Sequence, residues 1–117
     1  MGKKVFMYLI LGFLCNLLIY KRLYSQSIQT DTLKVYGNCG MCKARIEKAV
    51  IRKGVISAKW NPENQLLIVK YKPKVVSRAE IEQRILQVGH DLENQKAPDE
   101  IYEKLHNCCR YRKTGNN

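Results

Sequence analysis

The chain has 117 residues, of which 21 are basic and 10 are acidic, so its formal net charge is +11. This length suits one small domain with short extensions. The basic residues are scattered along the chain rather than clustered on one segment, so we expect no nucleic-acid partner.

The first 27 residues differ from the rest and have the layout of a secretory signal peptide. Two lysines near the start precede 16 uncharged residues at 5–20, and residues 25–27 place serines at the −3 and −1 positions of a cleavage site. We therefore expect export to the periplasm. Alternatively, the segment stays as an inner-membrane anchor facing the periplasm, because the basic residues 21 and 22 follow a slightly short span. Removal of residues 1–27 would take away four basic residues and lower the formal charge to +7.

Residues 28–96 carry the patterns of one small domain. Alternating apolar and polar residues predict strands, and apolar residues at helical spacing predict helices. In chain order, the expected elements are a strand at 31–36, a helix at about 41–54, strands at 55–60 and 66–71, a helix at 77–89 and a weak strand near 91–95. This order predicts an α+β fold, the ferredoxin-like βαββαβ sandwich, with an antiparallel sheet and two helices on one face.

Residues 97–117 form an extension that predicts a further helix. Pro98 and Asp99 are typical of a helix start, and Ile101, Leu105 and Cys108 recur at helical spacing. We expect the helix to continue through both C-terminal cysteines and to lay this apolar face on the domain. In such a helix, His106 and Cys109 would share a face, since they are three residues apart.

Four cysteines follow the N-terminal segment, in two tight pairs. Cys39 and Cys42 form a Cys-x-x-Cys motif between the first strand and the first helix, and Cys108 and Cys109 are adjacent. A Cys-x-x-Cys pair is consistent with a metal site, a redox dithiol or a structural disulfide. Adjacent cysteines seldom bridge each other, because consecutive Cα atoms are about 3.8 Å apart and disulfides need about 4.4–6.8 Å. The pattern therefore favours metal or redox chemistry over a disulfide framework.

Thiolates on a loop suit a soft metal ion. Cu(I) prefers thiolate sulfur, and two thiolates leave the ion open to attack by the thiols of a partner. The N-terminus of the helix beside Cys42 is expected to lower the thiol pKa and favour the thiolate. A structural zinc ion would require four protein ligands, and this loop supplies two.

A Cys-x-x-Cys loop between the first strand and first helix of a βαββαβ domain resembles the heavy-metal-associated domain family. That family includes copper chaperones, metal-binding domains of copper-transporting ATPases and the periplasmic mercury-binding protein. The resemblance covers residues 31–95 and implies that Cys39 and Cys42 are the metal ligands. The family usually has a methionine two residues before the first cysteine, where this chain has Gly37. Here Met41 lies between the cysteines, where it could pack inward or sit exposed as a weak third ligand, and we expect a packing or bystander role.

The resemblance also singles out His90. It aligns with a loop that lies near the metal loop in the family, so it is expected beside the site, as a third ligand or as an electrostatic influence. The role of the C-terminal cysteines stays open. In one alternative they make a second soft-metal site with His106, or join the first cysteine pair in a single site. In another, one of them forms a disulfide with Cys39 or Cys42. In the plainest alternative, Cys108 is a small core residue and Cys109 a free surface thiol.

The leading hypothesis is a periplasmic Cu(I) carrier that passes its ion by thiolate exchange to or from a partner, such as a metal transporter or efflux component. Zn(II), Hg(II) or Cd(II) is the alternative cargo, since His90, His106 or Asp91 would move the preference toward Zn(II) or Cd(II). A thiol–disulfide oxidoreductase and a non-catalytic adaptor with oxidised cysteines are the competing functions. We expect no enzyme, because the sequence has no Ser-His-Asp set, no phosphate loop and no paired carboxylates placed for acid–base work.

Overall fold

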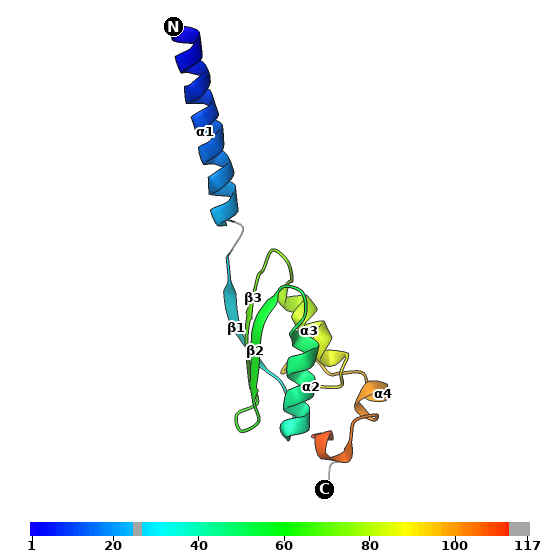
Figure 1. Cartoon of the computed structure of the whole chain (residues 1–117). Coiled ribbons are helices and arrows are strands. Elements are labelled where there is room, and N and C mark those ends of the chain that lie inside the picture. The colour runs from blue at the N-terminus through cyan, green and yellow to red at the C-terminus, as the bar shows by residue number, and fades with distance from the viewer. Residues whose placement is uncertain (25–26, 113–117) are drawn as a thin grey trace.

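The computed structural model describes residues 1–24 and 27–112, and the side chains in these ranges except those of residues 21–24. Figure 1 shows a long N-terminal helix followed by a domain in which two helices lie beside a sheet. The elements are α1 (Gly2–Tyr24), β1 (Gln29–Lys34), α2 (Gly40–Val50), β2 (Val55–Asn61), β3 (Leu66–Tyr71), α3 (Arg78–Leu86), α4 (Asp99–Tyr102) and the 3₁₀ helix η1 (Asn107–Cys109).

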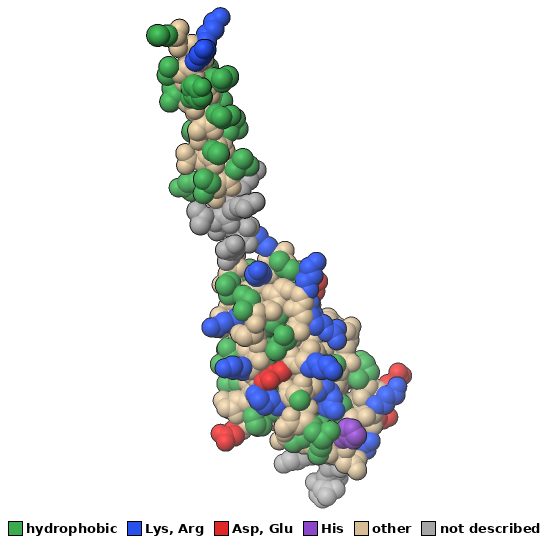
Figure 2. All heavy atoms as spheres, viewed as in Figure 1, with side chains coloured by type: hydrophobic (Ala, Val, Ile, Leu, Met, Phe, Trp, Pro, Cys, Tyr) green, Lys and Arg blue, Asp and Glu red, His purple; other side chains and the backbone are tan. Residues whose placement is uncertain are grey.

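The N-terminal helix α1 exposes its apolar side chains. Hydrophobic side chains cover its visible face (Figure 2), and none of its described side chains, at residues 2–20, belongs to the hydrophobic core, whose members lie between residues 33 and 109. By length and composition, the stretch Gly2–Tyr20 is long and apolar enough to cross a membrane, and a signal sequence meets the same description. Signal peptide and anchor therefore both stay predictions.

The sheet has the strand order β1-β3-β2, and β3 pairs antiparallel with both neighbours. The expected fourth strand near 91–95 is reduced to a single bridge between Val35 and Leu92. A longer strand does not form because the chain turns back at once. The Leu92 N–H bonds to the Gln95 carbonyl at 2.8 Å, and the Asp91 carboxylate accepts the Ala97 N–H at 2.7 Å.

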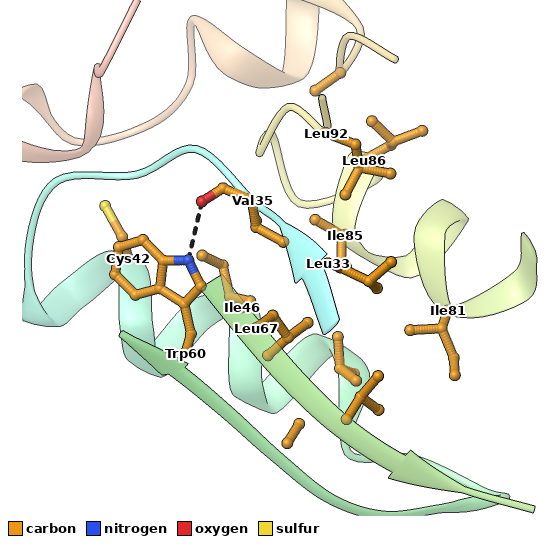
Figure 3. Close-up of a cluster of buried hydrophobic side chains, with 14 of the residues drawn as sticks. Leu33, Val35, Cys42, Ile46, Trp60, Leu67, Ile81, Ile85, Leu86 and Leu92 are labelled. Atoms are coloured by element: carbon orange, nitrogen blue, oxygen red, sulfur yellow. Dashed lines mark hydrogen bonds between the residues drawn. The ribbon is translucent and has the colours of Figure 1, made fainter. Parts of the chain in front are cut away.

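Helices α2 and α3 lie on one face of the sheet (Figure 1), which confirms the ferredoxin-like α+β fold. The expected capping box begins α3. The Ser77 hydroxyl accepts the Glu80 N–H at 3.1 Å, and the Glu80 carboxylate accepts the Ser77 N–H at 2.7 Å. Figure 3 labels ten side chains of the core between helices and sheet: Leu33, Val35, Cys42, Ile46, Trp60, Leu67, Ile81, Ile85, Leu86 and Leu92.

The C-terminal segment is not the continuous helix that the spacing predicts. Helix α4 ends at Tyr102, and η1 begins only at Asn107 after a turn. His106 interrupts the helix with an extended backbone, φ −57° and ψ 149°. The residues His-Asn-Cys-Cys all have low helix propensity, so the local sequence does not resist this break. As a result Cys109 is buried and Cys108 exposed, the reverse of the expected arrangement, and the predicted helix face shared by His106 and Cys109 does not exist.

Candidate metal centre

The Cys-x-x-Cys loop lies where β1 leads into α2. Cys39 is the N-terminal cap residue of α2 and is half-buried, and Cys42 lies in the first turn and is fully buried. Their sulfur atoms are 3.6 Å apart. The structure thus places the two predicted ligands side by side at the start of a helix, in the reduced form.

Trp60 fills the space beneath this loop. A Cβ atom on Gly37 would lie 3.0 Å from two carbons of the Trp60 ring and 3.1 Å from the Cβ atom of Cys42. The ring itself is fixed, because its Nε1 donates to the Val35 carbonyl at 2.9 Å (Figure 3). A methionine side chain at Gly37 would therefore collide with the Trp60 ring, which fills this space here.

Two side chains from distant segments hold the backbone that enters the loop. The Gln65 Nε2 donates to the Gly37 carbonyl at 2.8 Å, and the His90 Nδ1 lies 2.8 Å from the Tyr36 carbonyl, which can only accept its proton. Gln65 follows the β2–β3 turn with a left-handed backbone, φ 59°. Two segments distant in sequence therefore hold the loop backbone in the metal-free structure.

The C-terminal cysteines lie at the same place. The Cys39 sulfur is 3.6 Å from the Cys108 sulfur and 3.7 Å from the Cys109 sulfur, and the latter two are 3.8 Å apart. Within the described residues, these three supply the one group of three or more histidine, cysteine or acidic donors whose atoms lie within 4.8 Å of one another. The structure thus joins the two cysteine pairs at Cys39.

Met41 lies at the rim of this cluster. Its side chain is 47% exposed, and its sulfur is 3.4 Å from the Cys108 sulfur. Met41 does not pack beneath the loop, where Trp60 occupies the space, and its expected role as a bystander rather than a ligand stays a prediction.

His90 is buried next to the loop, but it is not one of the clustered donors. Its ring stacks on Tyr111, with ring centres 5.5 Å apart. Burial lowers the pKa of His90, so it stays neutral, and its Nε2 has no hydrogen-bond partner among the described residues. His106 is exposed and contributes its backbone carbonyl to the Cys109 N–H at 2.8 Å. The structure therefore gives His90 a place under the loop backbone and leaves His106 outside the cluster.

The thiols differ in acidity. The Cys42 backbone N–H lowers the pKa of Cys39 to about 7. The neighbouring thiols act in the same direction, and burial acts against them. Burial raises the pKa of Cys42 to about 12, although the Asn38 N–H lies 3.4 Å from its sulfur. The helix start therefore lowers the thiol pKa at Cys39, as expected, but not at Cys42, where burial outweighs its effect. Contact with Cys39 raises the pKa of Cys108 to about 11. Near neutral pH, Cys39 therefore ionises far more readily than Cys42 or Cys108.

Sequence patterns did not identify the residues that hold the C-terminal cysteines in place. The Tyr111 hydroxyl accepts the Asp91 N–H at 2.6 Å and donates to the Gly89 carbonyl at 2.9 Å. The Arg112 guanidinium binds both oxygens of the Asp91 carboxylate, at 2.6 and 2.8 Å, and lies over the Tyr102 ring. The available signal was an aromatic and a basic residue placed directly after the cysteines.

Comparison with known proteins agrees with this geometry. The model of the heavy-metal-associated domain family matches residues 32–109, about two thirds of the chain. Among curated proteins, none matches the sequence at a significant level.

Several solved structures are similar in fold and sequence. The CopZ metallochaperone is 33% identical over 55% of this chain and 98% of its own, with a TM-score of 0.53. A putative copper-ion-binding protein from Bacillus anthracis str. Ames is 30% identical over 59% and 100%, with a TM-score of 0.56. The N-terminal soluble domains of Bacillus subtilis CopA are 31% identical over 56% of this chain and 46% of theirs, with a TM-score of 0.53. The chain therefore belongs to the heavy-metal-associated domain family.

Proposed function

We propose that the chain is a carrier of a soft metal ion, with Cu(I) as the leading cargo and Cys39 and Cys42 as ligands. The observation that carries this proposal is the pair of sulfurs 3.6 Å apart at the start of α2, one of them a thiolate near neutral pH. Thiolate sulfur prefers soft ions such as Cu(I) over hard ones. The similarity to a metallochaperone and to a putative copper-ion-binding protein supports copper over Zn(II), Hg(II) and Cd(II).

The carrier would pass its ion on by ligand exchange. Cys39 is partly exposed, so a thiolate of a partner protein has access to an ion bound there, while the buried Cys42 keeps the second bond until the partner supplies its own. The acceptor or donor would be a transporter or efflux component. The likeness to the soluble region of the P-type ATPase CopA supports a partner of this class. No catalytic step is part of the proposal.

The same proposal places the domain in the periplasm, after export directed by residues 1–27 or on an inner-membrane anchor formed by α1. The apolar, exposed α1 supports both alternatives. Fractionation of cells that produce the full chain distinguishes them, because a cleaved product would be recovered as a soluble protein beginning near Ile28 and an anchored chain would remain with the membrane.

A thiol–disulfide oxidoreductase is the second candidate, favoured by the lowered pKa of Cys39 and by the nearby thiols of Cys42 and Cys108. The metal-free reduced chain would then reduce insulin disulfides at an appreciable rate. We expect no such activity above that of the Cys39→Ser variant.

Binding is tested with the reduced full-length chain in detergent micelles, which accommodate α1. Under anaerobic conditions, Cu(I) is titrated in competition with a chromophoric chelator. The Cys39→Ser/Cys42→Ser variant should compete far less well than the unmodified chain. Cys15→Ser is the matched control, since it removes a thiol of α1 outside the cluster. Equal competition by the double variant and the control would refute the assignment of this pair.

A further inference from the structure

The three sulfurs of Cys39, Cys108 and Cys109 form a nearly equilateral triangle with sides of 3.6, 3.7 and 3.8 Å. A point in its plane that is equidistant from the three sulfurs lies about 2.1 Å from each, close to the ~2.3 Å of a zinc–thiolate bond. An ion can therefore bind all three sulfurs after only a small expansion of the triangle.

From this arrangement, we propose that Cys39, Cys108 and Cys109 form a three-thiolate site for a soft ion, which shares Cys39 with the Cys39/Cys42 pair. The inference rests on the proposed function, because it concerns the same cargo. It gives the C-terminal extension a defined task, which is to supply two further sulfur ligands to the ion that the loop captures.

The two added cysteines are held in position by the fold. Cys109 is fully buried, and its backbone N–H bonds to the His106 carbonyl at 2.8 Å. Directly after it, Tyr111 bonds to the backbone of Gly89 and Asp91, and Arg112 pairs with the Asp91 carboxylate. The Cys39 corner of the triangle is held by the hydrogen bonds of Gln65 and His90 to the loop backbone. Both sides are thus positioned before the ion arrives, which lowers the entropy cost of binding.

Exposure suggests the order in which the ligands engage. Cys108 is exposed, with the Met41 sulfur 3.4 Å from it, so these two form the open rim of the site. Cys39 is half-buried, and Cys109 is at the base. An ion entering at the rim meets Cys39 and Cys108 first. Because Cys39 belongs to both sets, the ion can move between the three-thiolate site and the Cys39/Cys42 pair while it stays bound to one sulfur.

The site is tested by counting the sulfur ligands of Cu(I) with copper-edge X-ray absorption. The samples are the reduced full-length chain in micelles with one Cu(I) per chain, and the variants Cys42→Ser, Cys108→Ser/Cys109→Ser and Cys15→Ser. We expect three sulfur ligands in the unmodified chain, in Cys15→Ser and in Cys42→Ser. We expect two in Cys108→Ser/Cys109→Ser, which retains only the loop pair. Circular dichroism checks the fold of Cys42→Ser, with Cys42→Ala as a second version.

The outcomes separate this inference from the proposed function. Two sulfur ligands in the unmodified chain, unchanged in Cys108→Ser/Cys109→Ser, would overturn the three-thiolate site and leave the proposed carrier intact. A well-folded Cys42→Ser variant with fewer than three sulfur ligands would also overturn the site. An unmodified chain that takes up no Cu(I) would overturn both proposals.

Discussion

The Tyr111 ring stacks on the His90 imidazole, with ring centres 5.5 Å apart and ring planes inclined by 18°. His90 also contacts the Tyr36 carbonyl, one residue before the loop that bears the first cysteine pair. Tyr111 follows the second pair by two residues. This stack therefore connects the segments that carry the two cysteine pairs, and it helps to fix the position of one cysteine pair relative to the other.

The first prediction concerns the Tyr111 hydroxyl. Tyr111→Phe keeps the ring but leaves the Asp91 N–H and the Gly89 carbonyl without this partner. We expect a loss of ~1–3 kcal/mol in the free energy of unfolding, the usual cost of an unsatisfied buried polar group. Denaturant unfolding measures it. Tyr8→Phe in α1 is the control, since Tyr8 is exposed. A loss no larger than that of the control would contradict the assigned role.

The second prediction concerns the pair of Arg112 and Asp91. Burial alone would raise the pKa of Asp91, but the Arg112 guanidinium and the Ala97 N–H hold it below the usual 3.8. The stabilisation is therefore present above about pH 4 and is lost as the pH falls through the lowered pKa. We expect Arg112→Gln to lower the free energy of unfolding at pH 7 by ~1–3 kcal/mol.

The pH dependence provides the check on this pair. The difference between Arg112→Gln and the unmodified chain should shrink in acid unfolding experiments below pH 3.8, where Asp91 gains a proton in the variant first. Lys104→Gln removes one charge at an exposed position and should show no such trend. A constant difference across this pH range would mean that Arg112 acts through packing alone.

The third prediction concerns Gly37. A Cβ atom there would lie 3.0 Å from the Trp60 ring, so Gly37→Ala must displace the ring or the loop. We expect a loss of ~1–3 kcal/mol in the free energy of unfolding, as for other overpacked sites, together with weaker Cu(I) binding. Gly40→Ala is the matched control, because its Cβ would meet no atom within 4 Å. If both variants bind Cu(I) equally well, Trp60 does not set the loop position.

The fourth prediction concerns thiol reactivity. Since the pKa of Cys39 is about 7 and that of Cys42 is about 12, alkylation by iodoacetamide should reach half its maximal rate near pH 7 at Cys39. Cys42 should remain slow up to pH 10, because it is both protonated and buried. Peptide mass spectrometry after timed labelling of the metal-free reduced chain resolves the two sites. The opposite order of reactivity would show that the helix start acts mainly on Cys42.

Much of the fold follows from local patterns. Alternation predicts β2 and β3, and the Ser77 capping box predicts the start of α3, because these signals lie within the elements they specify. The Cys-x-x-Cys loop is likewise visible in the sequence, since its two cysteines are three residues apart.

The remainder depends on contacts between distant segments. The helical spacing of Ile101 and Leu105 suggests that α4 continues, yet the chain breaks at His106, and Arg112 and Tyr111 then tie it to Asp91. These partners are 20 or more residues apart, so no local period reveals them. The same holds for Trp60, whose position beneath the loop follows from the sheet register and not from the motif.

The most direct test of the account is the Cu(I) affinity of Cys39→Ser, measured against a competing chelator beside Cys15→Ser. The Cys39 sulfur lies within 3.7 Å of three other sulfurs, those of Cys42, Cys108 and Cys109. Loss of a residue that merely orients a ligand costs ~10–100-fold in metal affinity, so loss of the shared ligand should cost more than ~100-fold. We predict such a loss for Cys39→Ser and none for Cys15→Ser. Affinities within a few-fold of each other would contradict the claim that this thiol cluster holds the ion.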